Sequence, residues 1–459
     1  MVGFKLPKDF LIGTGHSAFQ SEGAVDRDGK TENWMDHIAK ERAGKPATHF
    51  EKTGATFSSD LTDNGCFFYD NYEEYVEDMQ KTGQNTFRFS LSWCRILPNG
   101  VGEVNPKGIA YYNKLIDKLL SCGIEPFVDL YHWDMPMCIA DQGAFLNPKF
   151  PEWFEYYAKV CFEAFGDRVK LWSTFNESQI SIHNGYRTGS FAPCHQDEKE
   201  YCTASLYCIL AHFRAVRLYK SMNLGGKIGA VHAMLNVAPV HLNDEDLGAV
   251  ERAMEHYFGW WTEPMVNGTF PRTLLRQYPH LDKMFPEGYQ QMLDKWFAPM
   301  DFVGLNYYMS KWSHNDPDSY LGYKRVESFY SAPGQAFTPY PPGLFDVVQY
   351  VSEKYPTIDI YITENGCATE NIHDEEKECD DTERVTYLRE HLRECARLIR
   401  AGYTRLKGYY YWCDADAFEN GRGYELRFGL TWVDHKTGKR TWKKSRHYFS
   451  NICKTHMVD

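Results

Sequence analysis

The feature that most constrains the fold of this 459-residue chain is an alternation of short apolar runs with helical patterns. Eight runs are typical of β-strands, because they are rich in β-branched and aromatic residues and stop at polar or small ones. They begin at Phe10, Thr86, Glu125, Leu171, Lys227, Asp301, Ile358 and Leu406. Helical patterns separate most of them, at residues 105–119, 150–165, 203–221, 245–259, 343–354 and 382–402. Eight alternating strand and helix units predict an α/β fold of the (β/α)8 TIM-barrel type.

A doubly wound open sheet is the alternative architecture for such an alternation. It is disfavoured because no glycine-rich phosphate-binding loop follows the first strand. No internal repeat, linker or low-complexity segment divides the chain, so we expect a single domain over residues 1–459. The polar segment 26–65 shows little periodicity and is expected to be a loop over one face. In this interpretation, long loops after the strands form the active-site cleft.

Two of the apolar runs end in a glutamate beside an asparagine. The run Ile358–Thr363 leads into Glu364 and Asn365, and the run Lys170–Phe175 leads into Asn176 and Glu177. Residues just past the strands of a barrel gather on one face. A single glutamate in such a position is more often a solvated or capping residue than a catalyst. Two of them in matching contexts predict a functional pair of carboxylates.

Other polar and aromatic side chains follow the remaining strands. They are Gln20, Arg88, His132, Asn306, Tyr308 and Trp412. The set contains no Ser-His-Asp order, no HExxH motif and no phosphate-binding loop, whereas paired carboxylates in a polar and aromatic cleft suit cleavage of a glycosidic bond. Taken singly, His132 is more often a structural histidine, Trp412 is equally explained as core, and Arg88 as a structural ion partner.

Charge and cysteine content exclude several classes of partner. The net charge is −12 with no basic tail, which argues against nucleic acid and anionic membranes. The 13 cysteines form no CxxC pair and no Cys/His cluster at zinc spacing, so we expect no metal and no cofactor. The N-terminal residues lack the apolar run of a signal peptide, and no apolar segment reaches membrane-spanning length. The expectation is a reduced, soluble, cytoplasmic protein, with a homo-oligomer left open.

The motifs that carry these residues resemble, nearly end to end, those of family-1 glycoside hydrolases, the β-glucosidase family. Residues 174–177, Thr-Phe-Asn-Glu, are similar to the acid/base motif of the family, and residues 362–366, Ile-Thr-Glu-Asn-Gly, to its nucleophile motif. Further similar motifs follow in family order at residues 20–23, 88–90, 132–136, 306–308 and 412–429. Each motif alone is modest evidence, and seven in register are highly specific.

The resemblance implies a retaining mechanism on a small β-glycoside substrate. Glu364 would be the nucleophile and Glu177 the acid and then the base, with the two carboxyl groups about 5 Å apart. It also implies roles for the surrounding side chains: Asn176 on the sugar 2-hydroxyl, Arg88, Asn306 and Tyr308 in support of Glu364, Gln20, His132 and Glu419 on the other ring hydroxyls, and Trp412 under the apolar face of the ring.

The chain departs from the family pattern directly after Glu419. The glucosidases of the family usually carry tryptophan there, whereas this chain has Asn420, which could donate to the sugar in its place. The change opens the sugar preference to galactose, fucose or a substituted glucose. The phospho-β-glucosidase branch is an alternative: Glu419 would repel a 6-phosphate, but Arg422 keeps that branch open. A non-catalytic sugar-binding relative is the other alternative, although both carboxylates are present.

Overall fold

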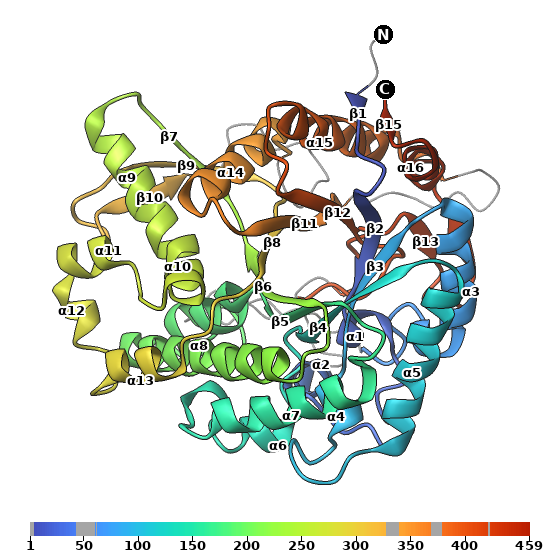
Figure 1. Ribbon diagram of the computed structural model, residues 1–459, viewed down its shortest axis with the longest axis horizontal. Coiled ribbons are helices and arrows are strands. Elements are labelled where there is room, and N and C mark those ends of the chain that lie inside the picture. Colours follow the sequence, from blue (N-terminus) through green and yellow to red (C-terminus); the bar gives the residue numbers. More distant parts are fainter. Residues whose placement is uncertain (1–3, 43–59, 61, 327–338, 369–378, 421–422) are drawn as a thin grey trace.

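Eight parallel strands close into a barrel in the computed structural model (Figure 1), which describes residues 4–42, 60, 62–326, 339–368, 379–420 and 423–459. The barrel strands are β2 (Leu11–His16), β3 (Thr86–Ser90), β4 (Glu125–Tyr131), β5 (Leu171–Asn176), β6 (Lys227–Ala233), β8 (Phe302–Asn306), β11 (Asp359–Asn365) and β12 (Leu406–Trp412). Strand β12 pairs with β2 and thereby closes the barrel. The predicted (β/α)8 barrel is confirmed, and each strand begins within one residue of its predicted start.

Helices pack around the barrel, and local sequence signals explain where several begin. Helix α5 (Pro106–Ser121) is capped by Asn105, whose side chain accepts a hydrogen bond from the backbone N–H of Lys107. The other long helices are α3 (Phe68–Thr82), α7 (Phe150–Phe165), α8 (Glu198–Ser221), α9 (Asp244–Met254), α14 (Pro341–Lys354), α15 (Thr382–Arg400) and α16 (Lys444–Thr455). None of the described helices is both long and apolar enough to cross a membrane.

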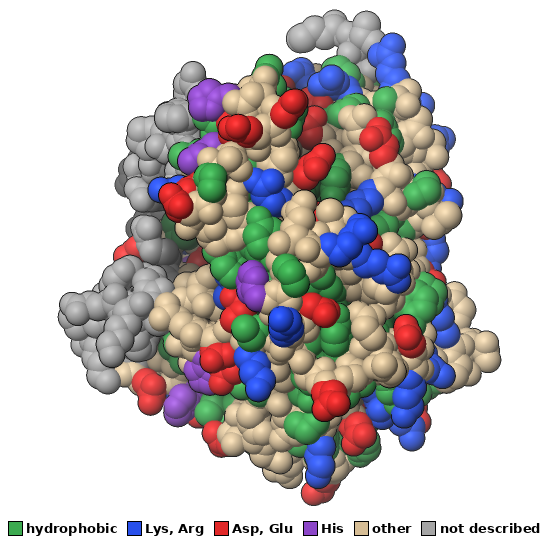
Figure 2. All heavy atoms as spheres, turned by 90° about the vertical axis from the view of Figure 1, so that its left-hand side faces the viewer, with side chains coloured by type: hydrophobic (Ala, Val, Ile, Leu, Met, Phe, Trp, Pro, Cys, Tyr) green, Lys and Arg blue, Asp and Glu red, His purple; other side chains and the backbone are tan. Residues whose placement is uncertain are grey.

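Shorter elements lie between these helices and the barrel strands, among them a 3-10 helix (Ala144–Leu146) and a π-helix (Gln179–Thr188). The short helices are α1 (Ala18–Ser21), α4 (Trp93–Ile96), α6 (Met137–Ala140), α10 (Trp260–Asn267), α11 (Arg272–Gln277), α12 (Pro279–Asp282) and α13 (Tyr289–Trp296). Three small sheets lie outside the barrel: β7 (Asn236–Pro239) with β9 (Ser310–Asn315) and β10 (Tyr323–Val326), β13 (Thr431–Val433) with β14 (Arg440–Trp442), and β1 (Phe4–Lys5) with β15 (Met457–Val458). The face in Figure 2 intersperses acidic and basic side chains with hydrophobic ones.

The expectation of a loop over residues 26–65 is wrong for part of that segment. Residues Trp34–Arg42 form helix α2, while residues 43–59 and 61 lie outside the described part. The side-chain oxygen of Asn33 accepts hydrogen bonds from the backbone N–H groups of Met35 and Asp36 and so caps the helix. The predicted helix at 245–259 also differs, because α9 ends at Met254 and continues as a π-helical turn, Glu255–Gly259.

The interior of the barrel is layered. A buried apolar layer consists of Phe127, Leu171, Val231, Phe302, Tyr361 and Tyr410. Side chains of a strand alternate between its two faces, so residues two positions further along return to the interior. Asp129 and Ser173 therefore lie above Phe127 and Leu171. Arg88 contacts Asp129 and completes this polar layer, and its guanidinium carbon lies 6.0 Å from the centre of the Phe127 ring. This polar layer lies directly beneath the carboxyl ends of the strands.

Candidate active site

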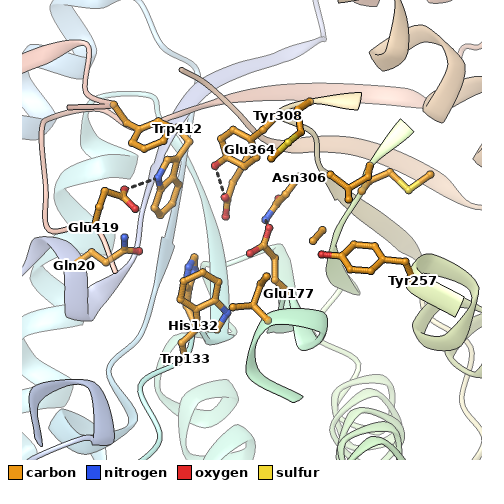
Figure 3. A pocket seen from close by; sticks show the side chains of 16 residues that line it. Gln20, His132, Trp133, Glu177, Tyr257, Asn306, Tyr308, Glu364, Trp412 and Glu419 are labelled. Atoms are coloured by element: carbon orange, nitrogen blue, oxygen red, sulfur yellow. Dashed lines mark hydrogen bonds between the residues drawn. The ribbon is translucent and has the colours of Figure 1, made fainter. Parts of the chain in front are cut away.

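A cavity of about 220 Å³ opens at the carboxyl ends of the barrel strands. Most of the predicted site residues line it, and Figure 3 shows Glu177 and Glu364 facing each other across it. The predicted residues in its wall are Gln20, His132, Glu177, Asn306, Tyr308, Glu364, Trp412 and Glu419. Within the described residues, no group of three or more His, Cys, Asp or Glu side chains is arranged to hold a metal ion.

Glu364 lies near the end of β11 and is held by two donors. Arg88 Nη1 donates to Oε1 at 2.7 Å, and the Tyr308 hydroxyl donates to Oε2 at 2.6 Å. Burial raises the pKa of Glu364, and both the charge of Arg88 and these hydrogen bonds oppose that effect. The nearby Gly366 is required because a Cβ there would lie 2.1 Å from the carbonyl oxygen of Trp412. The Glu-Asn-Gly sequence thus fits a carboxylate at a crowded strand end.

Glu177 has a different environment. It follows β5 in a left-handed backbone conformation, with φ of 47°, and its backbone N–H donates to the carbonyl of Val231 at 2.8 Å. Its Oε1 accepts one hydrogen bond, from Asn306 Nδ2 at 3.0 Å. Burial, and then the charge of Glu364, raise the pKa of Glu177 to about 8. One carboxyl is therefore placed to hold a proton near neutral pH and the other is surrounded by donors that favour its anion.

Asn176 and Arg88 lie behind the wall of the cavity and position the residues in it. The Asn176 side-chain oxygen accepts hydrogen bonds from Arg88 Nη2 at 2.7 Å and from Asn306 Nδ2 at 3.0 Å. Its amide nitrogen lies 3.1 Å from His132 Nε2. Burial and the charge of Arg88 lower the pKa of His132 well below its usual range, so His132 is neutral and can accept this hydrogen bond. Contact between Asn176 and a sugar hydroxyl stays a prediction.

The end of the cavity opposite Tyr257 is polar and aromatic (Figure 3). The Trp412 ring stacks on His132, with ring centres 5.5 Å apart and an angle of 17° between the planes. Trp412 Nε1 donates to Glu419 Oε1 at 3.3 Å, and burial raises the pKa of Glu419 to about 8. Gln20 donates to the carbonyl of Phe418 at 2.9 Å, which ties the first barrel loop to the last. Such a wall can bind hydroxyl groups and the apolar face of a sugar ring.

Asn420, like Asn176 and Arg88, is a predicted site residue that the structure does not place in the cavity wall. It follows Glu419 in a turn closed by reciprocal backbone hydrogen bonds between Glu419 and Gly423, both 2.7 Å long. The predicted donation from Asn420 to a sugar therefore stays a prediction. Arg422, on which the phosphorylated alternative depended, lies outside the described residues.

The wall also contains residues for which the sequence predicted no role in the site, although Trp133 and Phe428 belong to the motifs at residues 132–136 and 412–429. Met234 and Leu235 follow β6, so the rule that residues past a strand face the cavity could have found them. Tyr257 belongs to the π-helical turn after α9, and the guanidinium carbon of Arg325 lies 5.0 Å from the centre of its ring. No local sequence signal marks Tyr257. The remaining additions are Trp133, Ile180, Ala233, Met309 and Phe428.

A closed barrel with two buried carboxyl groups in unlike environments at its carboxyl end defines the class of protein as a barrel-type glycoside hydrolase. The sequence model of glycosyl hydrolase family 1 matches residues 3–458, and the chain belongs to this family. It is β-glucosidase-like: it is 35% identical over 462 residues to beta-glucosidase A of Thermotoga maritima, covering 99% of both chains.

Two further comparisons bear on structure and specificity. The solved family 1 β-glucosidase from Thermotoga maritima superposes with a TM-score of 0.92 at 33% identity, covering 100% of both chains. The 6-phospho-beta-glucosidase GmuD of Bacillus subtilis is 34% identical over 465 residues, covering 98% of this chain and 97% of its own. Family membership therefore leaves the choice between plain and phosphorylated sugars to the details of the cavity.

Proposed function

We propose that this protein is a retaining β-glycosidase that releases terminal non-reducing β-D-glucosyl residues, with galactosyl and fucosyl residues as further substrates. The observation that carries the proposal is the contrast between the two carboxyl groups. Glu177 has a pKa raised to about 8 and accepts one neutral hydrogen bond, whereas Glu364 is paired with Arg88 and Tyr308. An acid and a nucleophile need this division of roles at one pH.

The proposed reaction has two steps. A carboxylate oxygen of Glu364 attacks the anomeric carbon while Glu177 gives its proton to the leaving oxygen, so that the glycosidic bond breaks and a glycosyl ester forms on Glu364. Glu177, now ionised, takes a proton from a water molecule that attacks the same carbon and releases the sugar. The configuration is inverted twice and is therefore retained. In this proposal, residues 1–459 form one catalytic domain.

The sugar and its leaving group would occupy opposite ends of the cavity. Gln20, His132 and Glu419 are placed to read ring hydroxyls over Trp412, while Tyr257 lies on the other side of Glu177 (Figure 3). In this assignment Asn306 and Asn176 serve the reacting end of the sugar. The small sugar substrate is supported by the solved complex of the Thermotoga maritima β-glucosidase with glucoimidazole, at 34% identity and a TM-score of 0.89, covering 98% and 99% of the two chains.

The preference for unphosphorylated sugars rests on the charge of the cavity. Its wall contains Glu419 at the proposed sugar end, and no described Lys or Arg is part of it. A 6-phosphate would therefore be desolvated with no Lys or Arg of the described wall beside it, and Glu419 would repel it once ionised. Because burial raises the pKa of Glu419 to about 8, this repulsion grows as the pH rises through that value.

The test compares kcat/KM for p-nitrophenyl β-glucoside and for its 6-phosphate between about pH 6 and pH 9, a range that brackets the Glu419 pKa of about 8. We expect the unphosphorylated substrate to be favoured by on the order of 100-fold or more, since placing like charges together in a binding site costs several kcal/mol. The preference should increase with pH, and this increase should be lost in Glu419→Gln. Equal or better turnover of the phosphorylated substrate would establish a 6-phospho-β-glucosidase instead.

Asn420 leads to a prediction about the sugar 3-hydroxyl. The indole donor of the family is absent, so a 3-deoxyglucoside should lose only about 1–2 kcal/mol in kcat/KM, near the net worth of one neutral hydrogen bond. Asn420→Trp should increase this loss, while a 2-deoxyglucoside serves as the matched control whose loss should be the same in both variants. Rejection of the 3-deoxy substrate by several orders of magnitude in the native enzyme would show that another group has replaced the indole.

A further inference from the structure

Arg88 makes ion pairs with two carboxylates. Its Nη1 donates to Glu364 Oε1 at 2.7 Å and to the carbonyl of Thr363 at 3.1 Å. Its Nη2 lies 2.6 Å from Asp129 Oδ2 and donates to Asn176. The Arg88 side chain is 1% exposed and that of Asp129 is 0% exposed, so the ion pair between them is shielded from water. Two buried carboxylates therefore compete for one guanidinium.

The position of Asp129 follows from the barrel register. Asp129 lies on β4 directly across from Ser90 on β3 and from Ser173 on β5. Its Oδ1 accepts a hydrogen bond from the Ser173 hydroxyl, while its Oδ2 faces Arg88. Burial raises the pKa of Asp129, and the charge of Arg88 and the Ser173 hydrogen bond oppose this effect. Asp129 does not line the cavity, so it acts beneath the substrate and not on it.

We propose that Asp129 is a positioning residue that divides the charge of Arg88 between itself and Glu364 and thereby sets the acid limb of the pH profile. The inference rests on the proposed role of Glu364 as nucleophile. If Arg88 faced Glu364 alone, its full charge would stabilise the Glu364 carboxylate. With Asp129 on the other nitrogen, the pair Arg88 and Asp129 is nearly neutral at a distance, and Glu364 ionises at a higher pH than it otherwise would.

The other groups around Arg88 do not duplicate this effect. His132 on β4 is neutral because its pKa is far below the usual range, and Tyr308 keeps its proton because its pKa is well above the usual range. Tyr410 on β12 also has a raised pKa and remains neutral. Glu177 and Glu419 have pKa values raised to about 8, so both carry protons below that pH and add no negative charge there. Asp129 is thus the second anion that faces Arg88.

The test is the pH dependence of kcat/KM in Asp129→Asn, because this parameter reports the ionisation of the free enzyme. Asparagine keeps the size of the side chain and removes its charge, so the acid limb should move down by about one pH unit, the low end of the effect of a nearby charge. KM at the pH optimum should change little, because Asp129 does not touch the cavity. Asp129→Ser removes the charge with a smaller side chain and should move the limb in the same direction if the asparagine variant fails to fold.

Asp36→Asn is the matched control for the loss of a buried carboxylate. Asp36 belongs to helix α2, and its Oδ2 lies 2.5 Å from Lys30 Nζ. Both side chains are almost fully buried. This variant should lower stability and leave the acid limb in place. An unmoved or raised limb in both neutral Asp129 variants would overturn the proposal. That failure is distinguishable from a wrong nucleophile, because covalent trapping of Glu364 is measured on the native enzyme alone.

Discussion

Glu364→Ala abolishes turnover, and added azide restores it with an α-configured product: this is the expected result with the largest effect. Without the carboxylate, no glycosyl ester can form, and loss of a nucleophile costs on the order of 10⁴-fold or more in kcat. The truncated side chain leaves space beside Arg88 and Tyr308, the two donors that now bind Oε1 and Oε2. Azide can enter that space and attack once, so the configuration inverts. The measurement is the NMR assignment of the product anomer.

Trapping of the native enzyme gives an independent check on Glu364. A 2-fluoro glycoside with a good leaving group should form a stable ester, which peptide mass spectrometry would locate within β11. A β-configured azide product, or a label on another residue, would contradict the assignment of the nucleophile. If the native protein hydrolyses no aryl glycoside, the result would favour a non-catalytic sugar-binding protein.

Glu177→Ala has the second-largest expected effect, and its size depends on the leaving group. A substrate with a poor leaving group, such as an alkyl β-glucoside, should lose roughly 10²–10⁴-fold in kcat/KM, the usual worth of general acid catalysis. A 2,4-dinitrophenyl glucoside should lose little in this parameter, because its leaving oxygen departs without a proton. Added azide should accelerate the second step and give a β-configured product, since Glu364 is intact. Equal losses for both substrates would contradict the role of Glu177.

The pH dependence of kcat/KM gives a second prediction for Glu177. Burial and the charge of Glu364 raise the pKa of Glu177 to about 8, so its proton is present below that pH and is lost above it. For the alkyl glucoside, kcat/KM of the native enzyme should therefore fall as the pH rises past about 8. In Glu177→Ala this basic limb should be absent.

The barrel was predictable because each of its strands can be recognised separately in the sequence. Each is a short apolar run, and the residues that follow it lie at the carboxyl end of the barrel, so the sequence alone predicts where Glu177 and Glu364 lie. Helix α2 was missed because its residues are largely polar and its clearest start signal is Asn33, a single capping residue. Periodicity cannot detect a short helix whose stability comes from its cap and its neighbours.

Side chains that act across strands were beyond the reach of sequence patterns. Asp129 lies in the middle of an ordinary strand, and its link to Arg88 depends on the register of β3 against β4. Asn176 was predicted to hold the sugar 2-hydroxyl, and no sequence pattern indicated that its side chain also contacts Arg88, Asn306 and His132. These arrangements depend on tertiary packing, which local sequence does not encode.

The closure of the barrel by its first and last strands has a consequence for biosynthesis. The sugar end of the cavity joins Gln20 to Phe418, and Thr14 to Asp414 beneath it, across about 400 residues of chain. Such long-range contacts form slowly, because closing a long loop costs chain entropy before the contacts stabilise the fold. If the proposed function holds, a nascent chain cannot bind the sugar until β12 and the segment after it have left the ribosome and docked. Catalytic activity is for this reason a stringent reporter of completed folding, and a translation assay with timed sampling should show it appearing after full-length synthesis.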